Sequence, residues 1–221
     1  MIKLKQAGMM AAAVVLAAAG VASAYIATGG GPCNVGPSGP IPPNCTYRTP
    51  QQIHSLGLAD QVAYSAEHGG FVNQTSHQGG IFNGTVESFD STVILHIDGI
   101  KDYTGATATV KLPAHCETHI GPRDVKADFQ RFDTAMYSIQ GGASDENFES
   151  IKIVGGEANG MPSPGSTTLT RNRQGGFLVD STFQMNFHIE LVGRKGGKFD
   201  GVNISEDGTA TVKAYANETA K

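Results

Sequence analysis

Hydrophobic and polar positions alternate along much of the chain, most clearly between Phe177 and Leu191. In that stretch the odd-numbered positions are mostly apolar, whereas most of the even-numbered positions are polar. A period of two is typical of a strand in an antiparallel sheet that has one buried and one solvated face. We therefore expect a strand here, with Phe183, Met185 and Phe187 in the core.

Weaker runs of the same kind predict further strands at 89–97, 106–112, 128–139, 151–154 and 209–215. Turns are expected at the Gly pairs and Asp-Gly pairs between them, namely Asp98-Gly99, Gly141-Gly142, Gly155-Gly156, Gly196-Gly197, Asp200-Gly201 and Asp207-Gly208. One helix start is indicated at Thr49-Pro50-Gln51-Gln52, where Thr would be the N-cap. The pattern predicts an all-β protein, an antiparallel β-sandwich or barrel with at most one short helix.

The N-terminus has the pattern of a secretory signal peptide. Lys3 and Lys5 precede an alanine-rich apolar stretch that ends in Ala22-Ser23-Ala24, a small-x-small cleavage site. The stretch has about 15 residues and is shorter than the roughly 20 that span a bilayer, although an uncleaved anchor is the alternative. We predict a signal peptide over 1–24 and a secreted, periplasmic or extracellular protein that has no membrane contact after cleavage.

Residues 25–46 are rich in Gly and Pro and predict an N-terminal arm, followed by a β-sandwich domain over 47–221. Cys33 and Cys45 enclose the most proline-rich part of the arm. Because export brings thiols into an oxidising compartment, we expect a disulfide bond between these two cysteines. Cys116 is then left over, and burial is favoured over a free reactive thiol or a bond to another chain.

The charge composition of the chain excludes one class of partner. The 221 residues include 16 Lys and Arg against 20 Asp and Glu, which gives a formal net charge of -4. Binding to a phosphate backbone requires clustered positive charge, and the chain has no basic run. We therefore exclude nucleic acid as a partner.

Three segments resemble, in order and spacing, an uncharacterised β-rich module of exported bacterial proteins. They are a Phe-Asp-Thr block at 132–134, a Pro-Ser-Pro-Gly-x-Thr-Thr block at 162–168, and the segment Asp-Ser-Thr-Phe-Gln at 180–184, which corresponds to an Asp-Ser-Phe-Phe-Asp block of the family. In the third block, Thr182 and Gln184 stand where the family has Phe and Asp. The resemblance spans roughly residues 85–205. It implies an extracellular β-rich module and carries over no catalytic residue.

The segment His115-Cys116-Glu117-Thr118-His119 contains the side chains that bind zinc or copper, so His115, Cys116 and His119 are the candidate metal ligands. On a helix the two imidazoles would share one face. On a strand they would lie about 13 Å apart, at about 3.3 Å per residue, which is too far for one ion without a bend. Surface histidines on a sheet edge or loop are the alternative interpretation.

Two other candidate metal sites have weaker signals in the sequence. A histidine cluster would need four residues to converge on one sheet face: His68, His77, His96 and His188. Calcium would need acids from three separate strands: Asp90, Asp133 and Asp180. No cofactor is expected otherwise. The motifs Gly-x-Ser-x-Gly and His-Glu-x-x-His are absent, so the sequence does not favour an enzyme.

The predicted signal peptide, the predicted β-rich fold and the absence of catalytic motifs together predict a secreted, non-catalytic structural or binding module of the cell surface, the extracellular matrix or a filament. Its partner would be an extracellular ligand or a second copy of itself, to which the arm at 25–46 would add a strand. The alternative function is an exported copper- or zinc-binding protein that uses histidines and Cys116. Stoichiometric metal in the purified protein would favour this alternative.

Overall fold

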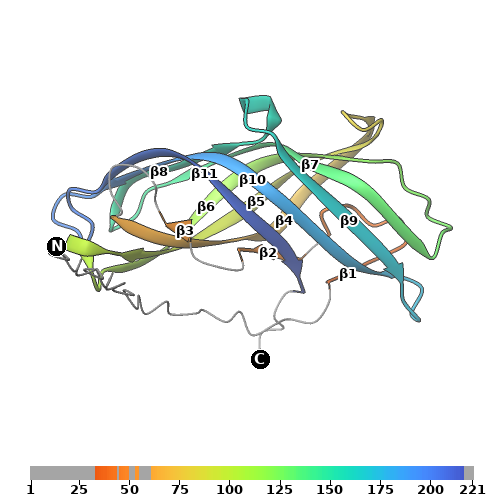
Figure 1. The fold of residues 1–221 in the computed structure, drawn as a ribbon, viewed down its shortest axis with the longest axis horizontal. Coiled ribbons are helices and arrows are strands. Elements are labelled where there is room, and N and C mark those ends of the chain that lie inside the picture. Colours follow the sequence, from red (N-terminus) through yellow and green to blue (C-terminus); the bar gives the residue numbers. More distant parts are fainter. Residues whose placement is uncertain (1–32, 44, 50–52, 55–60, 217–221) are drawn as a thin grey trace, which may run out of the picture.

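The computed structural model describes residues 33–43, 45–49, 53–54 and 61–216. In this part of the chain eleven strands join one sheet and two 3-10 turns are the only helical elements, which confirms the predicted all-β fold (Figure 1). The predicted signal peptide over 1–24 and residues 25–32 of the predicted arm lie outside the described residues. The strands are β1 Cys33–Val35, β2 Thr46–Arg48, β3 Ile53–His54, β4 Val62–Gly79, β5 Gly84–Gly99, β6 Thr107–Ile120, β7 Phe129–Ala143, β8 Phe148–Gly155, β9 Ser163–Arg171, β10 Phe177–Gly193 and β11 Asn203–Tyr215, with η1 at Lys101–Tyr103 and η2 at Glu157–Asn159.

The sheet closes on itself into a barrel-like ring. From β4 to β7, and again from β10 to β11, each strand pairs with the next in antiparallel fashion. Both β8 and β9 lie between β7 and β10: β9 pairs with the beginning of these two strands, and β8 pairs with their ends. The segment around η2 separates β8 from β9 and protrudes from the sheet (Figure 1).

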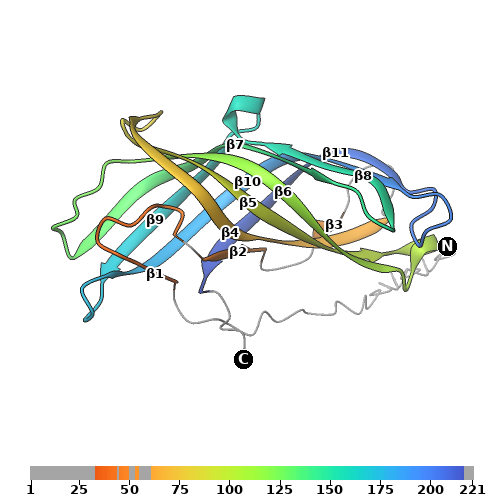
Figure 2. The ribbon, with the colours of Figure 1, turned by 180° about the vertical axis from the view of Figure 1, so that it is seen from behind.

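The ring is least continuous between β11 and β4. In the described residues these two strands are joined only through the short β2, whose Tyr47 pairs with Ala214 on one side and with His68 on the other. Figure 2 shows β2 between β4 and the C-terminal end of β11. Further along β4, Tyr64 pairs with Ile53 of β3. We call this junction the β4–β11 seam.

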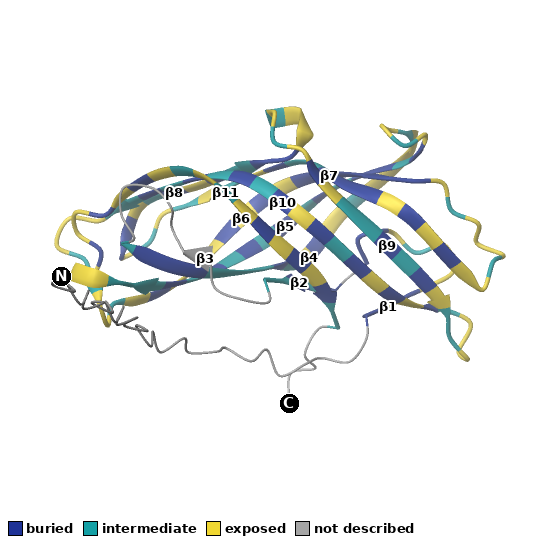
Figure 3. Ribbon diagram, viewed as in Figure 1, coloured by how far each residue is buried: buried dark blue, intermediate teal, exposed yellow. Residues whose placement is uncertain are grey.

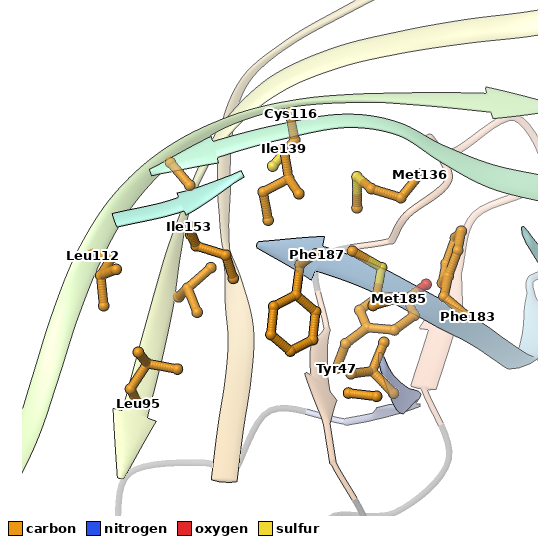
Figure 4. Packing of buried hydrophobic residues seen from close by; sticks show 14 of the residues in the cluster. Tyr47, Leu95, Leu112, Cys116, Met136, Ile139, Ile153, Phe183, Met185 and Phe187 are labelled. Carbon is orange, nitrogen blue, oxygen red and sulfur yellow. The ribbon is translucent and has the colours of Figure 1, made fainter. Parts of the chain in front are cut away.

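The interior of the ring is apolar because the strands alternate as the sequence predicts. Every odd-numbered residue of β10 from Phe177 to Leu191 is buried, and Leu178 on the opposite face is exposed. The same banding is visible along the neighbouring strands (Figure 3). Phe183, Met185 and Phe187 pack in the interior, as expected, against residues from β6, β7 and β8 (Figure 4).

The described part of the predicted arm belongs to the folded unit. β1 pairs with the beginning of β10, and the predicted disulfide joins Cys33 to Cys45. Cys33, Ile41 and Cys45 are each at most 3% exposed. A Gly- and Pro-rich segment thus contributes to the core without long regular structure, because the disulfide and the β1 ladder hold it. The packing begins well before Tyr47, the predicted domain start.

The helix predicted to start at Thr49 is wrong at Ile53 and His54, the part of it that the structure describes. Ile53 and His54 form β3, which pairs with β4, while residues 50–52 and 55–60 lie outside the described part of the chain. Local capping signals are weak compared with a free strand edge, and β4 offers such an edge at this position.

Two predicted turns are also wrong, because their glycines lie within strands. Gly141 pairs with Ala114 inside the β6–β7 ladder, and Gly208 pairs with Phe187 inside the β10–β11 ladder. Both positions are places of close approach. A Cβ on Gly141 would lie 2.9 Å from the Pro113 carbonyl oxygen, and one on Gly208 would lie 2.8 Å from the ring of Phe187.

Candidate functional site

The interior contains two small cavities that meet at His68. The larger has a volume of about 50 Å³ and lies beneath the β4–β11 seam, with walls from β4, β5, β7, β8, β10 and β11. Its lining is apolar apart from Thr49, Tyr64 and His68. The smaller, of about 10 Å³, lies between His68 and two methionines, Met136 and Met185.

His68 continues the inward row of Tyr64 and Ala66, and a bulge in β4 directly after it turns Phe71 inward as well. The β4–β5 register shifts between Gly69 and Val72, and Gly70 has a φ of +66°, a conformation that favours glycine. As a result His68 and Phe71, three positions apart, both point inward, and their rings pack edge to face at 5.1 Å. Without the bulge, residues three apart on a strand would lie on opposite faces.

His68 forms a buried polar cluster with Ser91 of β5 and Cys116 of β6. The Nε2 atom of His68 lies 2.8 Å from the Ser91 hydroxyl and 3.7 Å from the Cys116 sulfur, and the hydroxyl lies 3.4 Å from that sulfur. Burial lowers the pKa of His68 to about 4 and raises the pKa of Cys116 to about 12. At neutral pH both side chains are therefore uncharged, and the thiol is not an activated nucleophile.

The structure separates the three predicted metal ligands of β6. Cys116 is fully buried inside the ring, whereas His115 points outward and pairs with Asp90 at 2.8 Å. His119 lies under the β4–β5 turn, where its Nε2 contacts Glu117 at 2.8 Å and its ring stacks on Tyr137 at 4.0 Å. The strand conformation thus keeps the two imidazoles apart, as its rise per residue requires.

The predicted four-histidine cluster does not form. His68 is inside, whereas His96 contacts Thr109 on the outer face and His188 lies between Asp207 at 2.7 Å and Ser205 at 3.1 Å. Nδ1 of His77 lies 3.1 Å from the carbonyl oxygen of the neighbouring Gln78, on the exposed part of β4. Among the described residues, no group of three or more His, Cys, Asp or Glu side chains is arranged to hold a metal ion.

The three acids considered for calcium also lie apart. Asp90 is on β5, where hydrogen bonds from Asn73 and His115 lower its pKa. Asp180 pairs with Lys213 of β11 at 3.2 Å, and Asp133 lies opposite Ser166 of β9. Each therefore has its own local neighbours on a different strand.

The three blocks of the family resemblance lie on neighbouring strands, β7, β9 and β10, and the second and third blocks contribute to a buried hydroxyl cluster. Thr167 and Ser181 are 0% exposed and their hydroxyls lie 2.8 Å apart, while Tyr47 donates to Ser181 at 3.1 Å. Thr134 is equally buried, but its hydroxyl has no protein partner. The hydrogen bonds among Tyr47, Ser181 and Thr167 stabilise this polar region, whereas the unpaired hydroxyl of Thr134 does not.

The sequence did not predict that His68 lies next to Cys116, nor that Ser91 and the two methionines belong to the same buried site. The one local signal was Gly69-Gly70 directly after His68, because paired glycines within a strand pattern indicate a bulge. Contacts between residues 48 positions apart depend on the strand order and cannot be obtained from periodicity.

No family model, curated protein or solved structure matches the chain. The resemblance to a module of exported bacterial proteins therefore stays a prediction. No helix in the described ranges has the length and apolar character needed to cross a membrane.

Proposed function

We propose that this protein is an exported, non-catalytic binding module that takes the alkyl part of a small amphiphile into its closed sheet. The observation that carries the proposal is the apolar cavity beneath the β4–β11 seam. Closed antiparallel sheets of this size can hold one small ligand, and apolar cavities with a few polar groups are typical binding sites. Each buried methylene group would contribute about 0.8 kcal/mol.

The dimensions of the cavity favour a linear chain over a ring. An engineered cavity that binds benzene has a volume of about 150 Å³, three times the volume of about 50 Å³ found here. Met185 lines both the larger and the smaller cavity, and an unbranched thioether adopts new rotamers easily. A narrow alkyl chain would therefore enter at the seam and extend toward Met185.

Export is supported by two independent observations. The N-terminal sequence has the pattern of a signal peptide, and the Cys33–Cys45 disulfide is of a kind that persists in oxidising compartments. Thr49 and Tyr64, two of the polar residues that line the cavity beside the seam, would contact the polar head of the ligand.

The test is calorimetric titration with a linear fatty acid such as decanoate. We expect saturable binding with a negative heat-capacity change, since apolar surface is buried. Ala210→Leu would fill the cavity and displace about two methylene groups, which predicts a loss of affinity of about tenfold. Thr211→Leu adds a similar side chain on the outer face of the same strand and should leave affinity unchanged.

Absence of binding for every chain length, or equal affinity in Ala210→Leu, would overturn the alkyl-binding proposal. A structural role at the cell surface, in the matrix or in a filament would then stand as the proposal. Urea unfolding curves of both variants would show that each is folded during the titration.

A further inference from the structure

We propose that His68 and Cys116 bind a single Cu(I) ion inside the ring. The sulfur of Cys116 lies 3.7 Å from Nε2 of His68. Two such atoms bound to one trigonal or tetrahedral ion, at about 2.3 Å and about 2.0 Å from it, are about 3.5 to 3.7 Å apart. The pair already has the separation of two ligands of one metal.

The charge balance of the interior favours a monovalent ion. A thiolate and Cu(I) together are neutral, whereas a thiolate and Zn²⁺ retain one positive charge. The described residues around His68 are mostly apolar and contain no carboxylate within the two cavities to compensate that charge. Because an uncompensated charge is costly to bury, the site would discriminate against divalent zinc.

The neighbouring side chains are soft ligands. Met136 and Met185 line the smaller cavity together with His68, and Figure 4 shows Cys116, Met136 and Met185 directed into the interior. Met136 lies opposite Thr118, the next inward residue after Cys116 on β6. Thiolate and thioether ligands select Cu(I), so a methionine thioether would be the third ligand.

The remaining polar groups stay satisfied when the ion binds. Ser91 loses its contact with Nε2, but its hydroxyl can donate to the carbonyl oxygen of Ala114, 3.4 Å away. The Cys116 thiol releases its proton to solvent as the sulfur–copper bond forms, and no electron is transferred. His68 also lines the larger cavity, which gives the ion a route inward from the seam.

Anaerobic titration with Cu(I) buffered by bicinchoninate tests the proposal. With the Cys33–Cys45 disulfide intact, Cys116 is the single thiol among the three cysteines of the chain. We expect one Cu(I) per chain, and X-ray absorption should show sulfur and nitrogen neighbours. Cys116→Ala and His68→Gln should each abolish stoichiometric binding, and Met136→Leu combined with Met185→Leu should weaken it by about tenfold.

His115→Gln is the matched control, because His115 adjoins Cys116 in sequence but lies on the outer face. It should bind Cu(I) as the unaltered protein does, and circular dichroism would show that all variants are folded. Loss of binding in His115→Gln, retention in His68→Gln, no Cu(I) binding, or equally tight stoichiometric Zn²⁺ binding would each overturn the proposal. The copper site does not depend on the alkyl-binding proposal, because Cys116 and Met136 do not line the cavity proposed for the alkyl chain.

Discussion

Gly208 and Phe187 offer a direct test of how the interior is packed. The two residues face each other across β10 and β11, and an added Cβ at 208 would lie 2.8 and 2.9 Å from two atoms of the Phe187 ring. Such an overlap forces the ring or the strand to shift, so Gly208→Ala should lower the free energy of unfolding by about 1 to 3 kcal/mol. Phe187 is 5% exposed, and Phe187→Ala should cost about 3 to 5 kcal/mol.

The informative measurement is the double variant. Once the ring is removed, the nearest remaining contact of the new Cβ is the Tyr64 hydroxyl at 3.4 Å, an ordinary distance. Gly208→Ala should then be neutral or stabilise by about 0.5 to 1 kcal/mol, because alanine has less conformational entropy to lose than glycine. The two changes should therefore couple by about 2 kcal/mol in the stabilising direction.

Urea unfolding followed by far-ultraviolet circular dichroism provides the four free energies of this cycle, since the chain has no Trp to report by fluorescence. If Gly208→Ala costs the same with and without the ring, Phe187 does not occupy the space beside Gly208. The assignment of the inward row of β11 would then be incorrect.

Three further predictions concern stability. Burial lowers the pKa of His68 from 6.5 to about 4, so the unfolded chain binds more protons than the folded chain between these pH values. The free energy of unfolding should therefore fall by about 3 kcal/mol as the pH drops from 6.5 to about 4. His68→Gln should lose that part of the pH dependence in urea titrations. Thr134→Val should stabilise the protein by about 1 kcal/mol, because it removes an unpaired buried hydroxyl. Thr167→Val should destabilise the protein by a similar amount, because it breaks a buried hydrogen bond. A thermal unfolding scan distinguishes the two signs. Replacing Cys33 and Cys45 by Ser should cost about 2 to 4 kcal/mol by chemical denaturation.

The strands that could be predicted from the sequence are those whose inward rows are apolar. In β10 an uninterrupted period of two identifies both the strand and its buried face. β9 has no such signal, since Ser163 and Thr167 occupy two of its three buried positions and bond to neighbouring strands. In β4 the bulge after His68 breaks the period, and beyond it Val72 is exposed.

The candidate site depends on contacts that periodicity does not encode. The Cys33–Cys45 bond was predictable because the two residues are close in sequence and enclose a segment that forms no long element. The His68–Cys116 pair required the order β4-β5-β6 and the inward direction of both side chains. Cys116 was expected to be buried, and it is, but its partner came from a different strand than the adjacent histidines suggested.

The position of β2 in the ring constrains the order in which the chain can acquire its structure during synthesis. Tyr47 of β2 is synthesised before β4 to β10, yet one of its two partner strands, β11, is synthesised after them. Until then β2 has a neighbour only in β4, and its buried aromatic side chain is incompletely covered. Completion of the ring therefore has to follow the synthesis of β11 and depends on contacts of high sequence separation, while the hairpins from β4 to β7 can form earlier from local sequence.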